Sequence, residues 1–304
     1  MTSAAGQPLR AHYLELLKRS LLNELTIDME AQLLHTVLSC ANQQPLELES
    51  FWRARRNQGL IEAIRTARDG GDTLWLKGRL ASGGTATRYD LRNYSEFAAT
   101  LIGRKRLDHL QTCAETAILE GIEGDFLEAG VWRGGACILL AGVLKAYGES
   151  RNVWLADSFE GLPAATEPED QGWDLSATVL PVLAVSREEV TELFIRYDLL
   201  GENIRFLAGF FRETLPTYPG KRLAILRIDA DLYSSTWEAL TQLYPFVADG
   251  GFVIVDDYGS IEPCRNAVDL FTSKLGGVSL KWIDAHGVFW RRNLSTEQKK
   301  GVIR

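Results

Sequence analysis

The stretch DFLEAGVWRGGACILLAGVLKAYG, residues 125–148, decides the fold class of this chain. A short apolar run leads through a glycine-rich turn into an apolar run long enough for a helix, which is the pattern of a strand that bends tightly into a helix. Further apolar runs of strand length follow, with helical stretches between them; they are NVWLAD (152–157), IRFLAG (204–209), LAILRID (223–229) and FVIVDD (252–257). Strands that alternate with helices predict a mostly parallel sheet covered on both faces, an α/β fold of the Rossmann-like kind.

The two ends of the chain depart from this pattern. The run VSLKWIDAHGVFWRRN (278–293) has two strand-like halves around a short turn, which predicts an antiparallel hairpin at the edge of the sheet. Before residue 119 the sequence is helical in character, as in YLELLKRSLLNEL (13–25), whereas ASGGTATRYD (81–90) has the composition of a loop. We therefore predict a helical N-terminal cap over residues 1–118 and a Rossmann-like domain over residues 119–304.

The composition limits the class of protein. The 304 residues carry a net charge of −7, which argues against a nucleic acid as partner. The four cysteines form no CxxC pair, so neither a zinc site nor a disulfide framework is indicated. The sequence shows neither the pattern of a signal peptide nor an apolar run of membrane-spanning length. We expect a cytoplasmic protein that does not bind a membrane.

One connection is unusual. The segment LPAATEPEDQGWDLSATVLP (162–181) separates the strand NVWLAD from the next helical stretch. It is too long and too polar for a routine connection. Loops of this length are commonly lids or disordered segments.

The glycine turn indicates the kind of ligand. In a doubly wound sheet, ligands bind beyond the carboxyl ends of the strands. The first strand ends in Glu128 and Gly130, and Gly134 follows in the turn. A dinucleotide site needs a glycine where this chain has Trp132, whose side chain would obstruct a pyrophosphate. Such a turn suits S-adenosylmethionine, which has no phosphates, although a glycine-rich turn can also serve the chain alone.

The next two strand ends extend this interpretation. Asp157 stands where an acidic residue binds ribose hydroxyls in nucleoside-binding sheets, and Ser158 and Phe159 after it could line the adenine side. Phe210 and Phe211 after the third strand could stack on the base. Each feature has a structural alternative, since Asp157 could cap a helix and the phenylalanines could belong to the core. Acidic and glycine-rich strand ends in succession favour a nucleoside ligand.

Four aspartates follow the last two parallel strands: Asp229 and Asp231 after one, and Asp256 and Asp257 after the other. Carboxylates this close raise one another's pKa unless a cation lies among them. Oxygen ligands without a nearby histidine or cysteine favour Mg²⁺ over zinc. The alternative role, capping a helix, needs only one aspartate. A metal beside a methyl donor predicts O-methyl transfer, because it helps an alcohol to lose its proton to a carboxylate.

Six ordered motifs, from about residue 93 to residue 292, resemble those of the macrocin O-methyltransferase family, whose members methylate sugar hydroxyls of antibiotics. The motifs are FLEAGVWRGGACILLAGVLKAYG, VWLADSFEGLP, RFLAGFFRETLP, LAILRIDADLYSSTWEAL, GGFVIVDDYGSIEPCRNAV and GVFWRR. The resemblance implies an enzyme dependent on S-adenosylmethionine and Mg²⁺ that acts on a sugar hydroxyl of a glycosylated natural product or precursor.

The resemblance also implies roles for individual residues. Asp229, Asp256 and Asp257 would bind the metal, and Asp231 would be the general base. Tyr94 and Leu101 fall where the family's mobile cap approaches the sugar. The residues expected to contact the cofactor lie at three strand ends and are Glu128, Ala129, Gly130, Gly134, Asp157, Ser158, Phe159, Gly209 and Phe210.

Several features of the sequence admit more than one interpretation. The stretch around residues 30–88 is longer than is usual in the family, and it is either a surface insertion or a part of the acceptor pocket or of an oligomer interface. We expect a homo-oligomer. His286 occupies either a hairpin turn or the site. The alternative function is that of a catechol-type Mg²⁺-dependent O-methyltransferase acting on a small aromatic diol. Trp132 disfavours a nicotinamide oxidoreductase, and the four aspartates disfavour a binding module without activity.

Overall fold

The chain forms two compact units. The computed structural model describes residues 6–30, 32–33, 36, 58–70, 74–79, 85–91 and 97–294. One unit comprises Glu15–Arg104, and the other comprises Met1–Leu14 and Lys105–Arg304. The predicted boundary at residue 118 differs from this division. Helix α5 (Gly103–Leu119) belongs almost wholly to the larger unit, where the ring of His109 lies 4.2 Å from that of Phe289.

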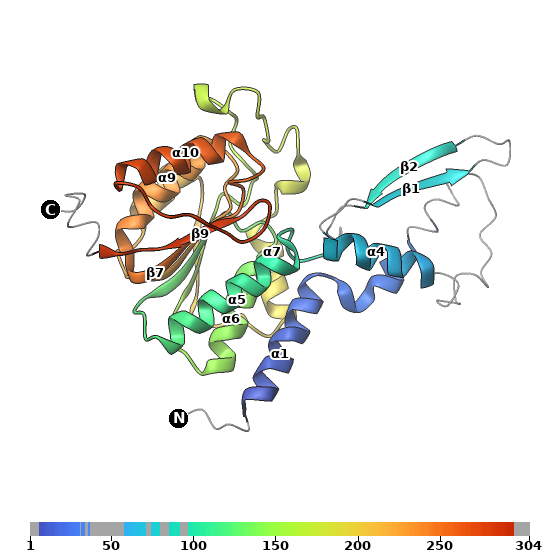
Figure 1. Cartoon of the computed structure of the whole chain (residues 1–304), viewed down its shortest axis with the longest axis horizontal. Coiled ribbons are helices and arrows are strands. Elements are labelled where there is room, and N and C mark those ends of the chain that lie inside the picture. The colour runs from blue at the N-terminus through green and yellow to red at the C-terminus, as the bar shows by residue number, and fades with distance from the viewer. Residues whose placement is uncertain are drawn as a thin grey trace. The chain divides into compact units, whose positions relative to one another are not determined.

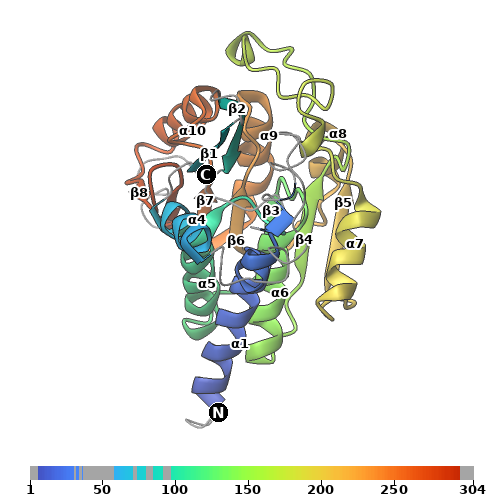
Figure 2. The same ribbon diagram turned by 90° about the vertical axis from the view of Figure 1, so that its right-hand side faces the viewer.

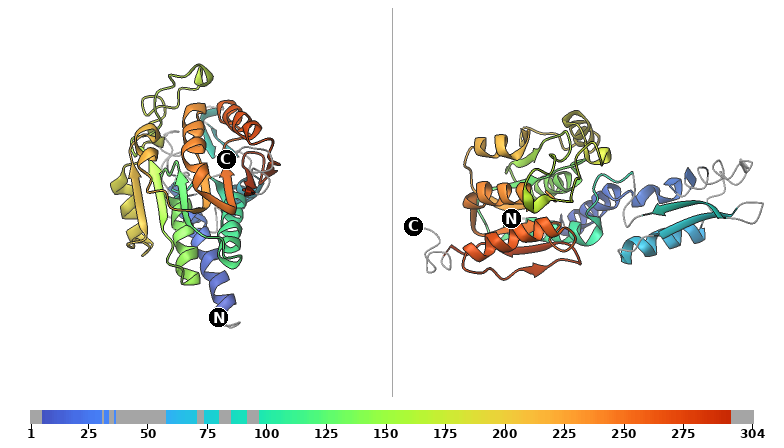
Figure 3. Two further views of the ribbon diagram at one scale, coloured as in Figure 1. Left: turned by 90° about the vertical axis from the view of Figure 1, so that its left-hand side faces the viewer. Right: turned by 90° about the horizontal axis from the view of Figure 1, so that it is seen from above.

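The smaller unit contains helix α4 (Gln58–Gly70) and a two-stranded antiparallel sheet, β1 (Leu74–Arg79) and β2 (Thr85–Leu91). Figure 3 shows this hairpin beside α4. The prediction of a loop over residues 81–90 is wrong for residues 85–90, which belong to β2. Threonine and tyrosine favour strands, and this preference outweighed the glycines that precede them.

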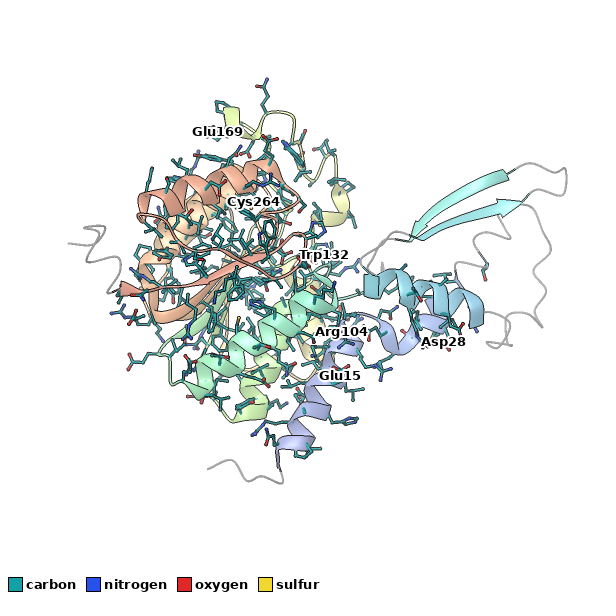
Figure 4. The ribbon with its side chains drawn as sticks, viewed as in Figure 1. Glu15, Asp28, Arg104, Trp132, Glu169 and Cys264 are labelled. Atoms are coloured by element: carbon teal, nitrogen blue, oxygen red, sulfur yellow. The ribbon has the colours of Figure 1, made fainter. Side chains whose placement is uncertain are left out.

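The two ends of the smaller unit are tied together. The amide of Ala99 donates to the carbonyl oxygen of Leu21 at 2.7 Å. Arg104 donates to both carboxylate oxygens of Glu15, at 3.0 and 3.1 Å, and these two side chains lie together in Figure 4. The smaller unit therefore begins in the second half of helix α1 (Gly6–Leu21) and ends just before α5. Hydrogen bonds join these two ends.

The larger unit is built on a seven-stranded sheet with the order β5-β4-β3-β6-β7-β9-β8. Five strands are parallel, and β9 runs antiparallel to β7 and to β8. The predicted Rossmann-like fold with a C-terminal antiparallel hairpin is confirmed. The strands are β3 (Asp125–Ala129), β4 (Val153–Asp157), β5 (Ile204–Ala208), β6 (Leu223–Ile228), β7 (Val247–Val255), β8 (Lys281–Trp282) and β9 (Val288–Arg291).

Helices cover both faces of this sheet, with α9 and α10 side by side on one face and α5 and α6 on the other (Figure 1). The central strands β3 and β6 are buried along their whole length, which explains their continuous apolar sequences. No helix in the described part of the chain is long and apolar enough to cross a membrane. The remaining helices of this unit are α6 (Gly135–Tyr147), α7 (Arg187–Arg196), α8 (Phe211–Thr214), α9 (Tyr233–Leu243) and α10 (Glu262–Lys274).

The strand order places a switch point at the centre of the sheet. From β3 the chain proceeds outward to β4 and β5, then returns to the other side of β3 with β6 and β7. Because these five strands are parallel, the turns after β3, β4, β6 and β7 all leave the same edge. In open α/β sheets this edge, at the switch point, is where ligands bind.

Candidate functional site

The aspartates that follow β6 and β7 come together at this edge. Ile228 pairs with Val255 in the parallel ladder, and the amide of Asp256 donates to the carbonyl oxygen of Ile228 at 3.0 Å. The side chains of Asp229, Asp256 and Asp257 each present an oxygen, and these three atoms lie within 4.8 Å of one another. The register of two strands thus assembles three of the four predicted carboxylates into one cluster.

Arg227, on β6, places a positive charge among these carboxylates. Its guanidinium donates to Asp256 at 2.5 Å and to Asp229 at 3.0 Å, and it also bonds Glu128 of β3. Its side chain is buried. Burial opposes its charge, but the neighbouring carboxylates raise its pKa well above the usual value, so it stays charged. Arg227 was not among the site residues predicted from the sequence. The signal for it was a charged side chain inside a fully buried strand, where a charge needs partners.

A second arginine holds Asp256 from α5. Arg106 bonds the Asp256 oxygen that Arg227 leaves free, and its Nε lies 3.1 Å from Asp284 in the β8–β9 turn. Asp284 in turn accepts from the amides of His286 and Gly287, both at 2.8 Å. Both oxygens of Asp256 are therefore held by guanidinium groups, and the hairpin turn is tied to the cluster.

His286 lies in that hairpin turn. Its backbone carbonyl accepts from the amide of Gly259 at 2.7 Å, two residues beyond Asp257. A Cβ on Gly259 would lie 2.0 Å from the carbonyl oxygen of Ala285, so the turn and the post-β7 loop are in close backbone contact. The backbone of His286 thus supports the loop that carries Asp257, whichever role its ring has.

The pKa values of Asp231 and Asp257 are raised by burial and by their acidic neighbours. Burial, together with the charges of Asp229 and Asp256, raises the pKa of Asp231 to about 7. Burial and the charges of the other three aspartates raise the pKa of Asp257 well above its usual range. Oδ2 of Asp257 is buried and has no hydrogen-bond partner among the described residues. A cluster of carboxylates with an unpartnered buried oxygen fits a hard divalent cation, which takes oxygen ligands.

The glycine turn after β3 packs directly on the aspartate turn. Gly130 has a φ of 88°, and a Cβ there would lie 1.7 Å from the carbonyl oxygen of Asp229. Glycine is therefore required for close approach as well as for the backbone conformation. Trp132 also has a positive φ, and its indole N–H donates to the carbonyl oxygen of Val182 at 2.9 Å. Gly134, at a φ of 84°, is the N-cap of α6.

Asp157 organises this turn. Its Oδ2 accepts from the amides of Val131 at 2.6 Å and Trp132 at 3.3 Å, and its Oδ1 accepts from the amide of Phe159 at 2.8 Å. The residue therefore lies beside the glycine turn, as the sequence interpretation expects, but it bonds three backbone amides rather than capping a helix of its own. Ser158 donates to the carbonyl oxygen of Gly161 at 2.6 Å.

The other predicted cofactor residues differ in exposure. Glu128 is buried, with bonds to Arg227 and, at 2.8 Å, from Cys137, and burial raises its pKa to about 7. Ala129 and Phe159 are buried as well. Gly209 donates to the carbonyl oxygen of Asp157 at 2.8 Å, which places the end of β5 beside that of β4, and Phe210 is exposed. A cofactor role for each of these residues stays a prediction.

Tyr94 and Leu101 are the two residues predicted to approach the acceptor. Tyr94 lies outside the described residues. Leu101 is half-buried and belongs to the smaller unit. Their roles stay predictions.

Comparison with known proteins identifies sequence relatives over most of the chain. A family model described as macrocin O-methyltransferase (TylF) matches residues 10–292. The demethyldecarbamoylnovobiocin O-methyltransferase of Streptomyces niveus is 49% identical over 209 residues, which cover 67% of this chain and 80% of that protein. The mycinamicin III 3''-O-methyltransferase of Micromonospora griseorubida is 46% identical over 207 residues, covering 66% and 81% respectively.

Solved structures show the same fold. The O-methyltransferase NovP superposes with a TM-score of 0.63 at 50% identity, over 64% of this chain and 83% of that one. The calicheamicin methyltransferase CalS11 superposes with a TM-score of 0.52 at 19% identity, over 61% and 78%. At that identity the second likeness supports the fold alone.

Proposed function

The chain belongs to the macrocin O-methyltransferase family, and from this membership we propose that it methylates a sugar hydroxyl of a glycosylated natural product, with S-adenosylmethionine as methyl donor and Mg²⁺ as metal cofactor. The observation that carries the proposal is the carboxylate cluster after β6 and β7, which lies next to the glycine turn and to Asp157. Metal ligands, general base and cofactor-binding turn then share one edge of the sheet.

Three carboxylates of this edge would hold the metal. Asp229, Asp256 and Asp257 offer oxygens within 4.8 Å of one another. Mg²⁺ in such a site supplies positive charge that makes an alcohol more acidic. Arg227 and Arg106 fix the orientation of Asp256, so this ligand needs little rearrangement on binding. The unpartnered oxygen of Asp257 gains a partner.

Asp231 would accept the proton of the acceptor hydroxyl. It is half-buried, and burial with the neighbouring negative charges raises its pKa to about 7. This value holds for the metal-free site; Mg²⁺ bound by the neighbouring aspartates would lower it and keep Asp231 ionised, ready to accept a proton. The position of Asp231, two residues after Asp229 on the same turn, brings the base next to the proposed metal.

The cofactor would bind across the turns after β3, β4 and β5. Asp157 already holds the glycine turn through the amides of Val131 and Trp132, both bonded to Oδ2. Its Oδ1 accepts from one amide, that of Phe159, and from the Ser158 hydroxyl at a longer 3.4 Å, so Oδ1 is the oxygen more open to a ribose hydroxyl. Phe159 follows β4 and Phe210 follows β5, and we expect both to supply apolar surface for the adenine ring. Because Gly130 packs closely against the carbonyl of Asp229, a donor bound at the glycine turn would lie near Asp231, the proposed general base.

The acceptor class rests on the family and on the relatives, one of which is named for a substrate that bears a rhamnosyl group. Three acceptors named for them provide probes: demethyldecarbamoylnovobiocin, mycinamicin III and 8-demethyl-8-(2,3-dimethoxy-α-L-rhamnosyl)-tetracenomycin C. The protein is incubated with each probe, or with catechol, in the presence of S-adenosylmethionine, with Mg²⁺ or with EDTA. We expect Mg²⁺-dependent addition of one methyl group to at least one sugar-bearing probe, detected by mass spectrometry. Methylation of catechol alone, or undiminished activity in EDTA, would contradict the proposal.

A further inference from the structure

The segment between β4 and α7, residues 162–185, is ordered by contacts with the site. It projects from one end of the sheet in Figure 2, and Figure 4 marks Glu169 on it. Leu162 forms an isolated bridge with Ser176 across the segment. Near its end, the carbonyl oxygen of Val182 accepts from the indole of Trp132 in the glycine turn at 2.9 Å. The segment is thus fixed at its base to one ligand-binding turn.

Its middle is fixed to another turn through Asp170. Between residues 162 and 184, all of which are described, Asp170 alone is fully buried. Its carboxylate accepts from the amides of Tyr233 at 2.6 Å and Ser234 at 3.1 Å, and from the hydroxyl of Ser234 at 2.8 Å. This polar segment therefore buries the carboxylate of Asp170 against the first turn of α9.

Helix α9 depends on this carboxylate. Its own N-cap, Leu232, makes no side-chain cap hydrogen bond. The first amides of a helix have no partner within the helix and carry partial positive charge, so a carboxylate is their strongest natural acceptor. Asp170 provides it from more than sixty positions away in the sequence, which ties the segment to the helix.

The turn directly before α9 carries Asp229, a proposed metal ligand, and Asp231, the proposed general base. Asp231 has a φ of 55°, a conformation costly for a residue with a side chain, and the amide of Leu232 donates to the carbonyl oxygen of Ala230 at 2.6 Å. On the strand side, the amide of Asp229 is held by the carbonyl oxygen of Ala129 at 2.8 Å. A strained turn persists only when both of its sides are fixed. Asp170 fixes the helix side.

We propose that Asp170 is a positioning residue: by holding the first turn of α9 it fixes the turn that carries Asp229 and Asp231, and so couples the 162–185 segment to the general base. The inference rests on the proposed function for the role of Asp231, but not for the anchor itself. Withdrawal of the segment releases the helix start and lets the turn relax from the geometry needed for proton transfer.

The anchor is tested by amide hydrogen exchange on the metal-free, acceptor-free protein. In Asp170→Ala the amides of Tyr233 and Ser234 should exchange about tenfold faster or more, because they lose their acceptor. Asp170→Asn should stay within about threefold of wild type, since asparagine caps helices nearly as well as aspartate. The matched control is Asp174→Ala, which removes an exposed carboxylate of the same segment that accepts only locally, from the amide of Ser176 at 3.0 Å. Wild-type exchange in Asp170→Ala overturns the proposal.

The coupling to Asp231 is tested by a double-mutant cycle, with whichever of the three sugar-bearing probes the wild type methylates. Asp170→Ala should lower kcat about tenfold, the scale of a small misplacement of a reacting group. In the Asp231→Asn background the same change should cost less than about twofold, because there is no base left to position. An equal loss in both backgrounds means a general structural defect and overturns the coupling. If no probe is methylated, the proposed function fails, and the exchange experiment still decides whether Asp170 holds the turn.

Discussion

Replacing Arg227 by methionine should lower the stability of the protein strongly, and more at high pH than at low pH. The guanidinium bonds Asp256 at 2.5 Å and Asp229 at 3.0 Å, and it also bonds Glu128. Methionine fills a similar volume but leaves these carboxylates without that cation. Breaking a buried ion pair by removing one partner costs about 3–5 kcal/mol, because the remaining charge is buried and uncompensated.

The costs of losing the three contacts are not additive, because each carboxylate that loses the arginine can bind a proton instead. Burial already raises the pKa of Glu128 to about 7 while Arg227 is present, and loss of the arginine raises it further above the value in the unfolded chain. Between the two pKa values the native state holds more protons than the unfolded state, so the stability of the variant falls as the pH rises. The loss should be about 3–5 kcal/mol near pH 8. At lower pH it should shrink by up to about 1.4 kcal/mol per pH unit for each carboxylate that is protonated in the variant but still ionised in the wild type.

The assay is thermal unfolding at about pH 6 and about pH 8 in EDTA, where the loss near pH 8 corresponds to about 6–20 °C in Tm. The matched control is Arg196→Met, which removes the exposed pair that Arg196 forms with Glu192 at 2.6 Å on α7. Its Tm should stay close to that of the wild type. A Tm of Arg227→Met within about 2 °C of the wild type near pH 8 would refute the electrostatic account. So would a loss of equal size at both pH values.

Four further predictions concern the site. Asp231→Asn should lower single-turnover rates about 10²-fold or more while S-adenosylmethionine and Mg²⁺ affinities stay near those of the wild type, whereas Asp256→Asn should weaken Mg²⁺ binding in a titration and recover activity in excess Mg²⁺. Rescue of Asp231→Asn by Mg²⁺ would reverse the two roles. Because the pKa of Asp231 is raised to about 7, the metal-free native state retains protons that the unfolded chain loses near pH 4; its Tm should fall as the pH rises from about 5 to about 8, and the stabilisation by Mg²⁺ should grow over the same range. A flat profile would contradict this. Asp157→Ala should weaken S-adenosylmethionine binding in calorimetry, since it removes the acceptor of three loop amides as well as the expected ribose contact. Gly130→Ala should cost about 3 kcal/mol or more in thermal unfolding, because its Cβ would lie 1.7 Å from a backbone oxygen; Gly277→Ala, with a similar φ of 85° and open space around it, measures the backbone strain alone and should cost less.

The sequence predicted the central strands of the larger unit most directly, because β3 and β6 are buried along their whole length and are therefore almost continuously apolar. β3 (Asp125–Ala129) is the short apolar run that opens the stretch of residues 125–148. β7 was placed too late, since it starts at Val247 and runs through Asp249, Gly250 and Gly251. Gly250 has a φ of 76°, and the ladder with β6 shifts register in this region. Pairing with a neighbouring strand kept these turn-like residues in the sheet, which no local pattern reveals.

The site was predictable where it depends on strand ends and not where it depends on contacts between distant segments. The aspartates follow apolar runs, so their meeting at one edge could be inferred. Arg227 bonds Glu128 and Asp256, residues that only the strand order brings together. Asp170 sits among exposed polar residues, and only the fold shows that it is buried against α9. The sequence around Arg227 and around Asp170 does not reveal the distant residues that each of them contacts.

The closure of the smaller unit has a consequence for how this chain can change over evolutionary time. That unit is interposed between residues 14 and 105, and its two ends are joined by the Ala99–Leu21 hydrogen bond and the Arg104–Glu15 pair. Because the two ends of the smaller unit are already joined, the larger unit is attached to it at the same two points, whatever the length of the chain between them. Closing a loop costs only about 0.6 kcal/mol for each doubling of length. Residues can therefore be gained, lost or grafted between these points while the enzyme that hosts them keeps its own fold.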